Sequence, residues 1–223
     1  ILLILVLILV VGSYYIKDKI SGKVVEQQVC PIVTFDSNKN FVINREKSFP
    51  IGFWGFYDEA PRNSWIEYKP FNVVVDAPKS YFSSTTLSNY KTYQFTQTSG
   101  NLNIVSETKN NNRIIGWEVT HEPNSYGITA KQIQAEADAI RYEDQCQRSV
   151  FITPSAGGVT NGYLESVKTF VDFAVIQAGY RVPYLPISGT GELIKQGATI
   201  MGNKPVILGM QAVGYQPSRY RLN

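Results

Sequence analysis

The chain has 223 residues, enough for one substantial hydrophobic core or for one domain with an attached segment. Its formal net charge is +3, and its basic residues are scattered, so nucleic-acid binding is not expected. There is one histidine and no C-x-x-C pair, so no metal site is predicted. No phosphate-loop or dinucleotide signature occurs, and therefore no cofactor is expected.

The first residues form an apolar segment. Residues 1–11 are Ile, Leu and Val throughout, and the uncharged stretch continues to Ile16. The chain does not begin with Met, so we expect further residues upstream that would lengthen this segment. We predict that residues 1–20 are a hydrophobic helix acting as a signal anchor, with a cleaved signal peptide as the alternative. Membrane contact through residues 1–16 would place the rest of the protein outside the cytoplasm, anchored or secreted.

Residues 21–40 are polar and are predicted to be a linker. This linker contains Cys30, and the second cysteine is Cys146. The two are compatible with one disulfide in an exported protein, and equally with two unrelated thiols.

From residue 41 to residue 223, apolar runs alternate with helical or connecting segments, and we interpret this range as one domain. The runs predicted as strands are residues 49–56, 71–76, 90–97, 113–122, 149–153, 171–177 and 205–211. Continuous apolar strands that alternate with helices indicate a parallel sheet covered on both faces. About seven βα units without a dinucleotide fingerprint favour an α/β fold of the (β/α)8 TIM-barrel type, with its strands adjacent in chain order. An eighth strand is expected beyond Asn223.

Three segments are predicted as helices. The first begins after Thr129, which forms a capping-box pattern with Gln132. The others are residues 162–169 and 191–201.

In such a barrel, a disulfide between Cys30 and Cys146 requires the segment that contains Cys30, residues 21–40, to pass around or beneath the strands.

The stretch R-I-I-G-W-E-V-T-H-E-P-N, residues 113–124, is the most informative in the chain. Glu122 ends a predicted strand that leads to a helix, which is where α/β proteins bind ligands. Simple alternation places Glu118, Thr120 and Glu122 on one face and Trp117 against the helices. A buried Glu118 must be paired, and an ion pair with Arg113 or a neighbouring Lys is expected.

Four motifs in order carry a resemblance to a known family: F-P-I-G-F-W-G-F, G-W-E-V-T-H-E-P, V-D-F-A-V-I-Q and K-P-V-I-L-G-M-Q-A-V-G. They resemble the catalytic barrel of glycoside hydrolases of the retaining clan A type, over residues 41–223. The resemblance implies that Glu122 is the acid/base. It places His121 where the family usually has Asn or Asp, as a residue that contacts substrate. It also places Gln211 where the family has its nucleophilic Glu, and an amide cannot form a glycosyl ester.

Aromatic residues gather near the predicted strand ends, where flat rings suit sugar surfaces, although core packing competes for each one. Asp76 also closes a predicted strand, with turn initiation as the competing role. The candidate substrate-binding residues are His121, Trp54, Tyr57, Asp76, Tyr126, Tyr180, Gln211 and Tyr215.

Three functions are compatible with these residues. The first is a membrane-anchored or secreted glycoside hydrolase acting on extracellular carbohydrate. The second is an inactive barrel that binds saccharide or a protein partner. The third is a structural surface protein in which the barrel is a spacer.

Overall fold

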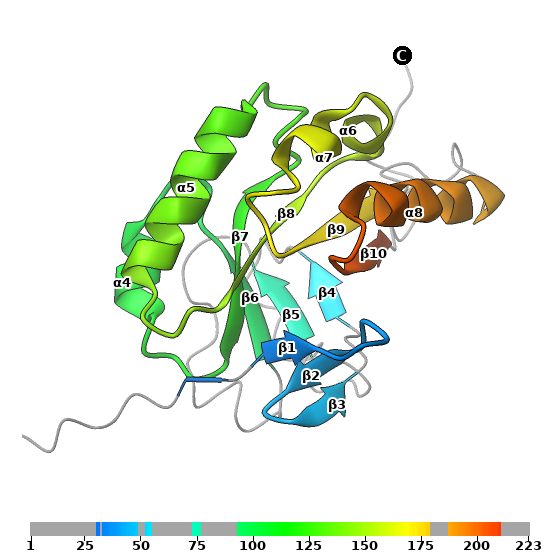
Figure 1. Cartoon of the computed structure of the whole chain (residues 1–223). Coiled ribbons are helices and arrows are strands. Elements are labelled where there is room, and N and C mark those ends of the chain that lie inside the picture. The colour runs from blue at the N-terminus through cyan, green and yellow to red at the C-terminus, as the bar shows by residue number, and fades with distance from the viewer. Residues whose placement is uncertain are drawn as a thin grey trace, which may run out of the picture.

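The computed structural model describes residues 30–31, 33–48, 52–54, 73–76, 93–178 and 187–210. Their strands form a three-stranded antiparallel sheet and a seven-stranded parallel sheet (Figure 1). The predicted apolar segment, residues 1–16, lies outside the described residues. Within the described ranges, no helix is long and apolar enough to cross a membrane.

The parallel sheet has the strand order that the sequence predicts. Each strand pairs in parallel with the next one along the chain. The strands are β4 (Gly52–Trp54), β5 (Val73–Asp76), β6 (Tyr93–Gln97), β7 (Ile114–His121), β8 (Ser149–Thr153), β9 (Phe173–Ala178) and β10 (Val206–Met210). Among the described residues no ladder joins β4 to β10, so the part of the sheet that the structure describes is curled and open, as in a partial barrel.

Five helices of the described chain lie outside this sheet (Figure 1). They are α4 (Asn103–Thr108), α5 (Ala130–Glu143), α6 (Ala156–Thr160), α7 (Tyr163–Val167) and α8 (Ile187–Met201). The predicted capping box is present before α5, because Thr129 and Gln132 exchange side-chain-to-backbone hydrogen bonds. The α8 helix begins at Ile187, earlier than the predicted start at Gly191, and α4 and α6 were not predicted.

Two apolar clusters occupy the two faces of the sheet. The outer cluster joins Trp117, Val119 and Ile152 to the buried stripe of α5, as predicted for Trp117. The inner cluster is rich in phenylalanine and includes Phe95, Ile115, Phe151 and Phe173. The rings of Phe151 and Phe173 are stacked, with centroids 4.6 Å apart. This inner cluster fills the barrel lumen with side chains.

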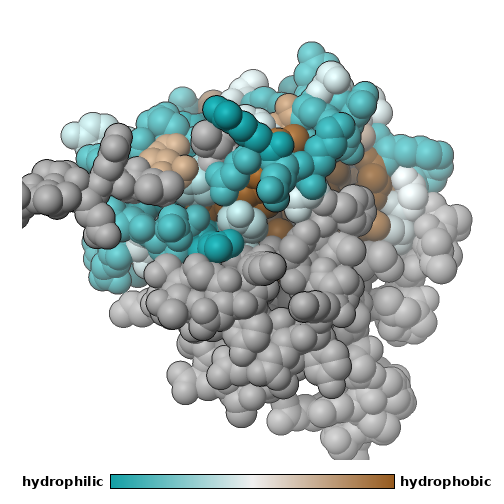
Figure 2. Space-filling model, turned by 90° about the horizontal axis from the view of Figure 1, so that it is seen from below, coloured by the Kyte–Doolittle hydropathy of each residue, from teal (hydrophilic) through white to brown (hydrophobic). Residues whose placement is uncertain are grey.

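The antiparallel sheet lies below the parallel strands in Figure 1 and consists of β1 (Val33–Phe35), β2 (Phe41–Ile43) and β3 (Glu46–Ser48). Its aromatic side chains enter the inner cluster. The Phe35 ring lies 5.7 Å from that of Phe173, and the Phe41 ring lies 5.9 Å from that of Phe95. In Figure 2, which views the molecule from below, the coloured part of the surface is mostly hydrophilic, with hydrophobic patches within it. We call β1–β3 the plug; its first strand lies within the range predicted as a linker.

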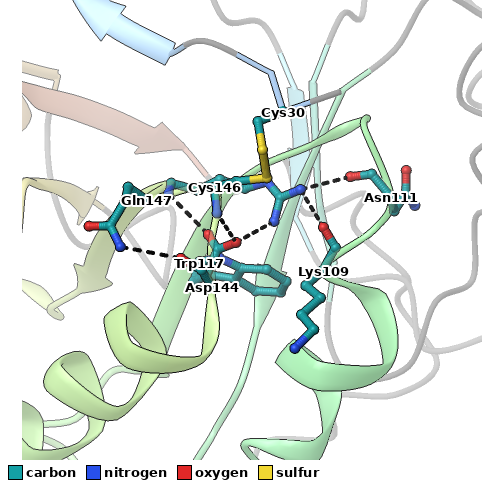
Figure 3. Close-up of a disulfide and its surroundings, with 8 residues drawn as sticks. Cys30, Lys109, Asn111, Trp117, Asp144, Cys146 and Gln147 are labelled. Carbon is teal, nitrogen blue, oxygen red and sulfur yellow. Dashed lines mark hydrogen bonds and ion pairs between the residues drawn. A yellow bond between two sulfur atoms is a disulfide. The ribbon is translucent and has the colours of Figure 1, made fainter. Parts of the chain in front are cut away.

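A disulfide joins Cys30 to Cys146, with the Cα atoms 5.4 Å apart (Figure 3). The bond connects the segment that leads into the plug with the turn between α5 and β8. The described residues that precede the barrel, 30–31 and 33–48, therefore lie at the lower end of the strands (Figure 1). Next to the disulfide, the buried carboxylate of Asp144 accepts hydrogen bonds from Trp117 Nε1 and Arg148 Nη1, both at 2.8 Å.

Candidate active site at the carboxyl ends of the strands

An irregularity in β7 decides which side chains face the lumen. The pairing of β7 with β8 shifts register between Glu118 and His121. As a result Glu118 and His121 lie on the same side, with His121 Nδ1 3.4 Å from Glu118 Oε1. Thr120 instead contacts Glu136 of α5, outside the sheet, at 3.5 Å. The expectation that Glu118, Thr120 and Glu122 share a face is therefore wrong, because it assumed unbroken alternation.

A polar layer lies above the phenylalanine cluster. Gln97, Thr153 and Gln177 each follow an inner-cluster residue of their own strand by two positions, so they face the same side about 6–7 Å further along. Glu118 is the register partner of Gln97. We call Gln97, Glu118, Thr153 and Gln177 the polar layer. It was not predicted, although the polar residue closing each apolar strand is visible in the sequence.

Glu118 is fully buried within this layer. Burial raises the pKa of its carboxyl group, while His121 and Thr153 act in the opposite direction. His121 Nδ1 lies 3.4 Å from Glu118 Oε1, a contact that is an ion pair only when the imidazole is protonated, and among the described residues neither Glu118 carboxyl oxygen has a hydrogen-bond partner. The predicted pairing with Arg113 is replaced by that contact, and the Arg113 guanidinium lies over the Tyr93 ring, 5.0 Å from its centroid.

Glu122 is the first residue after β7 and is partly buried. Its φ angle of 46° is left-handed, a conformation that costs a non-glycine residue about 1–2 kcal/mol. Two backbone hydrogen bonds hold it there: its N–H donates to the Thr153 carbonyl at 2.8 Å, and its carbonyl accepts from Ser125 N–H at 2.8 Å. Left-handed residues of this kind cluster at functional sites.

The loop after Glu122 is fastened to the neighbouring strand end. Asn124 donates through Nδ2 to Ser155 Oγ at 2.7 Å and accepts at Oδ1 from Ser155 N–H at 3.1 Å. Gly158 leaves the space for this amide, since a Cβ there would lie 2.6 Å from Asn124 Oδ1. These three residues were not predicted.

The structure describes some of the remaining candidate residues and not others. Trp54 and Asp76 are the last residues of β4 and β5, at the same edge of the sheet as Glu122, and are described by their backbone. Tyr126, in the loop before α5, is 71% exposed. Tyr57, Tyr180, Gln211 and Tyr215 lie outside the described residues. Among the described residues, no group of His, Cys, Asp and Glu could hold a metal ion.

In chemical terms, the described side chains at this edge include a partly buried carboxyl group, at Glu122, and a layer of hydrogen-bonding side chains. A carboxyl group in such a position can donate a proton to a bound oxygen and later remove one from water. Amide, hydroxyl and imidazole groups can bind the hydroxyl groups of a ligand.

The similarity of this chain to known proteins is one of fold and not of sequence. No protein-family model matches the sequence, and no curated protein matches it. The fold is similar to a β-glucuronidase from Ruminococcus gnavus, with a TM-score of 0.61 and 12% identity over 84% of this chain and 41% of that one. It is also similar to a glycoside hydrolase family 17 β-1,3-glucanosyltransferase from Rhizomucor miehei, with a TM-score of 0.58 and 13% identity over 71% of this chain and 70% of that one.

The chain thus spans about two fifths of the length of the glucuronidase chains that it matches. At these identities the likeness concerns the fold alone, a curled parallel sheet with helices outside it.

Proposed function

We propose that this protein is a carbohydrate-active barrel of the retaining clan A type, with Glu122 as the general acid/base. The observation that carries the proposal is the position of Glu122. It follows the fourth strand of a glycoside-hydrolase-like sheet, held in a left-handed conformation beside a polar layer. Carboxyl ends of barrel strands are where enzymes of this fold build their active sites.

In the proposed reaction, the Glu122 carboxyl group protonates the glycosidic oxygen while a second carboxylate attacks the anomeric carbon, so that the bond to the leaving group breaks as a glycosyl ester forms. The Glu122 carboxylate then removes a proton from the water molecule that displaces this ester. Gln211 cannot form the ester, so the candidates for the second carboxylate in the sequence are Asp58, Glu59 and Asp76. His121 binds a substrate hydroxyl group. The other residues proposed to contact the sugar are Trp54, Tyr57, Asp76, Tyr126, Tyr180, Gln211 and Tyr215.

A second function is favoured by one residue. Gln211 occupies the place where the resembled family has its nucleophile, and an amide cannot form the covalent glycosyl-enzyme intermediate. The second proposal is therefore an inactive barrel that binds saccharide or a protein partner through the same edge.

We further propose that residues 1–20 are a signal anchor or signal peptide, that residues 21–40 link it to a domain spanning 41–223, and that the barrel works outside the cytoplasm. Contact with the membrane would be made by residues 1–16. The Cys30–Cys146 disulfide supports this location, because disulfides persist in oxidising compartments. An eighth strand would close the sheet between β10 and β4.

The test is a hydrolysis assay on an aryl β-glucoside, an aryl β-glucuronide and a linear β-1,3-gluco-oligosaccharide, chosen for the two kinds of structural neighbour. Hydrolysis by the wild type that falls in Glu122→Gln supports the enzyme. A gain of activity in Gln211→Glu would identify the missing nucleophile. Absence of hydrolysis with saturable oligosaccharide binding, weakened by Tyr126→Ala or Tyr215→Ala, selects the binding protein. A result of neither hydrolysis nor oligosaccharide binding would overturn both the enzyme and the saccharide-binding protein.

A further inference from the structure

The sequence departs from the resembled family at His121, and the structure places an ionisable partner against that residue. The fully buried Glu118 carboxyl group lies 3.4 Å from His121 Nδ1. The contact exists because the register shift in β7 brings both side chains to the lumen side. The His121 side chain is 20% exposed, so the ring joins the buried layer to the surface beside Glu122.

We propose that Glu118 is a positioning residue: its carboxylate accepts a hydrogen bond from Nδ1–H of His121 and fixes the ring as the tautomer whose Nε2 is an acceptor. In that tautomer, Nε2 accepts a hydrogen bond from a ligand hydroxyl group. This second half rests on the proposed carbohydrate site, whereas the pairing of Glu118 with His121 does not.

A histidine at position 121 needs a hydrogen-bond acceptor at Nδ1 if its ring is to hold one tautomer. An asparagine side chain offers a donor and an acceptor in fixed positions, whereas a neutral imidazole carries its proton on either nitrogen. The hydrogen bond made by one ring nitrogen decides the state of the other. A carboxylate at Nδ1 therefore converts an ambiguous ring into a defined acceptor at Nε2.

The surroundings of the pair act on the Glu118 carboxyl group in opposite directions. Burial is the largest effect and raises its pKa, whereas His121 and Thr153 lower it. The other charged groups in the described surroundings are Glu136, behind the strand, and Glu122, next to His121 in the chain.

The experiment uses the single histidine of the chain. In protein labelled with ¹⁵N and carrying no histidine tag, long-range ¹H–¹⁵N correlations of one imidazole report which nitrogen is protonated. For the wild type with a neutral ring, we expect Nδ1 protonated and Nε2 unprotonated. For Glu118→Leu, which removes the acceptor at similar volume, we expect this preference to be lost. Glu136→Gln is the matched control and should keep the wild-type tautomer.

A wild-type ring protonated at Nε2 would overturn the proposal, because Glu118 would then be the donor. The proposal also fails if Glu118→Leu folds and keeps the wild-type tautomer. Since the wild-type spectrum decides the first outcome, a variant that does not fold leaves the test intact. Adding the β-1,3-gluco-oligosaccharide then tests the second half: the Nε2 signal should move on binding. A protein that binds no carbohydrate but shows the Nδ1–H tautomer disproves the proposed function and leaves the pairing standing.

Discussion

Glu118 links burial to pH at the scale of single residues. Burial raises the pKa of its carboxyl group in the folded protein above the ordinary value of an unfolded chain. Folding therefore favours the protonated form. The protonated Glu118 carboxyl group therefore stabilises the folded protein fully at a pH below its pKa in the unfolded chain. This stabilisation is lost as the pH rises through its pKa in the folded protein.

The first prediction follows from this loss of stability with rising pH. Glu118→Gln removes the titration, so the variant should gain stability relative to the wild type as the pH rises above about 4, the ordinary range of a Glu carboxyl group. Thermal unfolding of both proteins across this range measures the difference. A stability difference that does not change with pH would contradict the assigned burial of the carboxyl group.

A second residue-scale prediction concerns the pair of Asp144 and Arg148, whose side chains are 1% and 0% exposed. Arg148→Met leaves the Asp144 carboxylate buried and without its cation, which should cost about 3–5 kcal/mol in the free energy of unfolding. The control is Lys195→Met, which breaks an exposed pair with Glu192 and should cost no more than about 1 kcal/mol. Denaturant unfolding compares the two; equal losses would contradict the account.

At the scale of elements, α8 packs on β9 through a glycine. A Cβ on Gly197 would lie 1.8 Å from Ile176 Cδ1, whereas a Cβ on Gly191 of the same helix meets no atom within 4 Å. Alanine is the better helix former by about 1 kcal/mol, but overpacking costs about 1–3 kcal/mol. We therefore predict that Gly197→Ala lowers the melting temperature and Gly191→Ala raises it. A rise in both variants would show that the helix packs further from the sheet.

Elements built from a local signal were predictable from the sequence. Runs of apolar residues gave the strands and their order, and the Thr129–Gln132 pair gave the start of α5. The α4 and α6 helices have five or six residues each and lack such a cap signal, so periodicity did not reveal them.

The candidate site was predictable only in part. The position of Glu122 followed from the strand and proline pattern. The partner of Glu118 did not, because a register shift between β7 and β8 depends on both strands together and leaves no mark in either one. The Asn124–Ser155 link likewise joins segments 31 residues apart.

At the scale of the whole molecule, the disulfide ties the plug segment to the barrel. It joins residues 116 apart in the sequence, so its removal should cost on the order of 2–4 kcal/mol, mainly by freeing the unfolded chain. We predict that replacing Cys30 and Cys146 together by Ser lowers the midpoint of denaturant unfolding and leaves the near-ultraviolet circular dichroism of the folded core unchanged. An unchanged midpoint would contradict this role of the bond.

The plug itself explains how the lumen is closed at its lower end. Phe35 and Phe41 complete the inner aromatic cluster from below, so the polar layer and Glu122 lie at the opposite end of the strands. One end of the strands is therefore closed by packed aromatic side chains, and the opposite end carries the polar layer and Glu122, where we propose that the ligand binds.

The most direct measurement of the central claim compares Glu122→Gln with the wild type on two aryl glycosides of the same sugar, one with a poor and one with a very good leaving group. If Glu122 donates the proton, kcat/KM on the poor leaving group should fall by about 10²–10⁴-fold, and the loss on the good leaving group should be much smaller, because that bond needs little protonation. Equal rates for the variant and the wild type on both substrates would contradict the assignment of Glu122 as the acid/base.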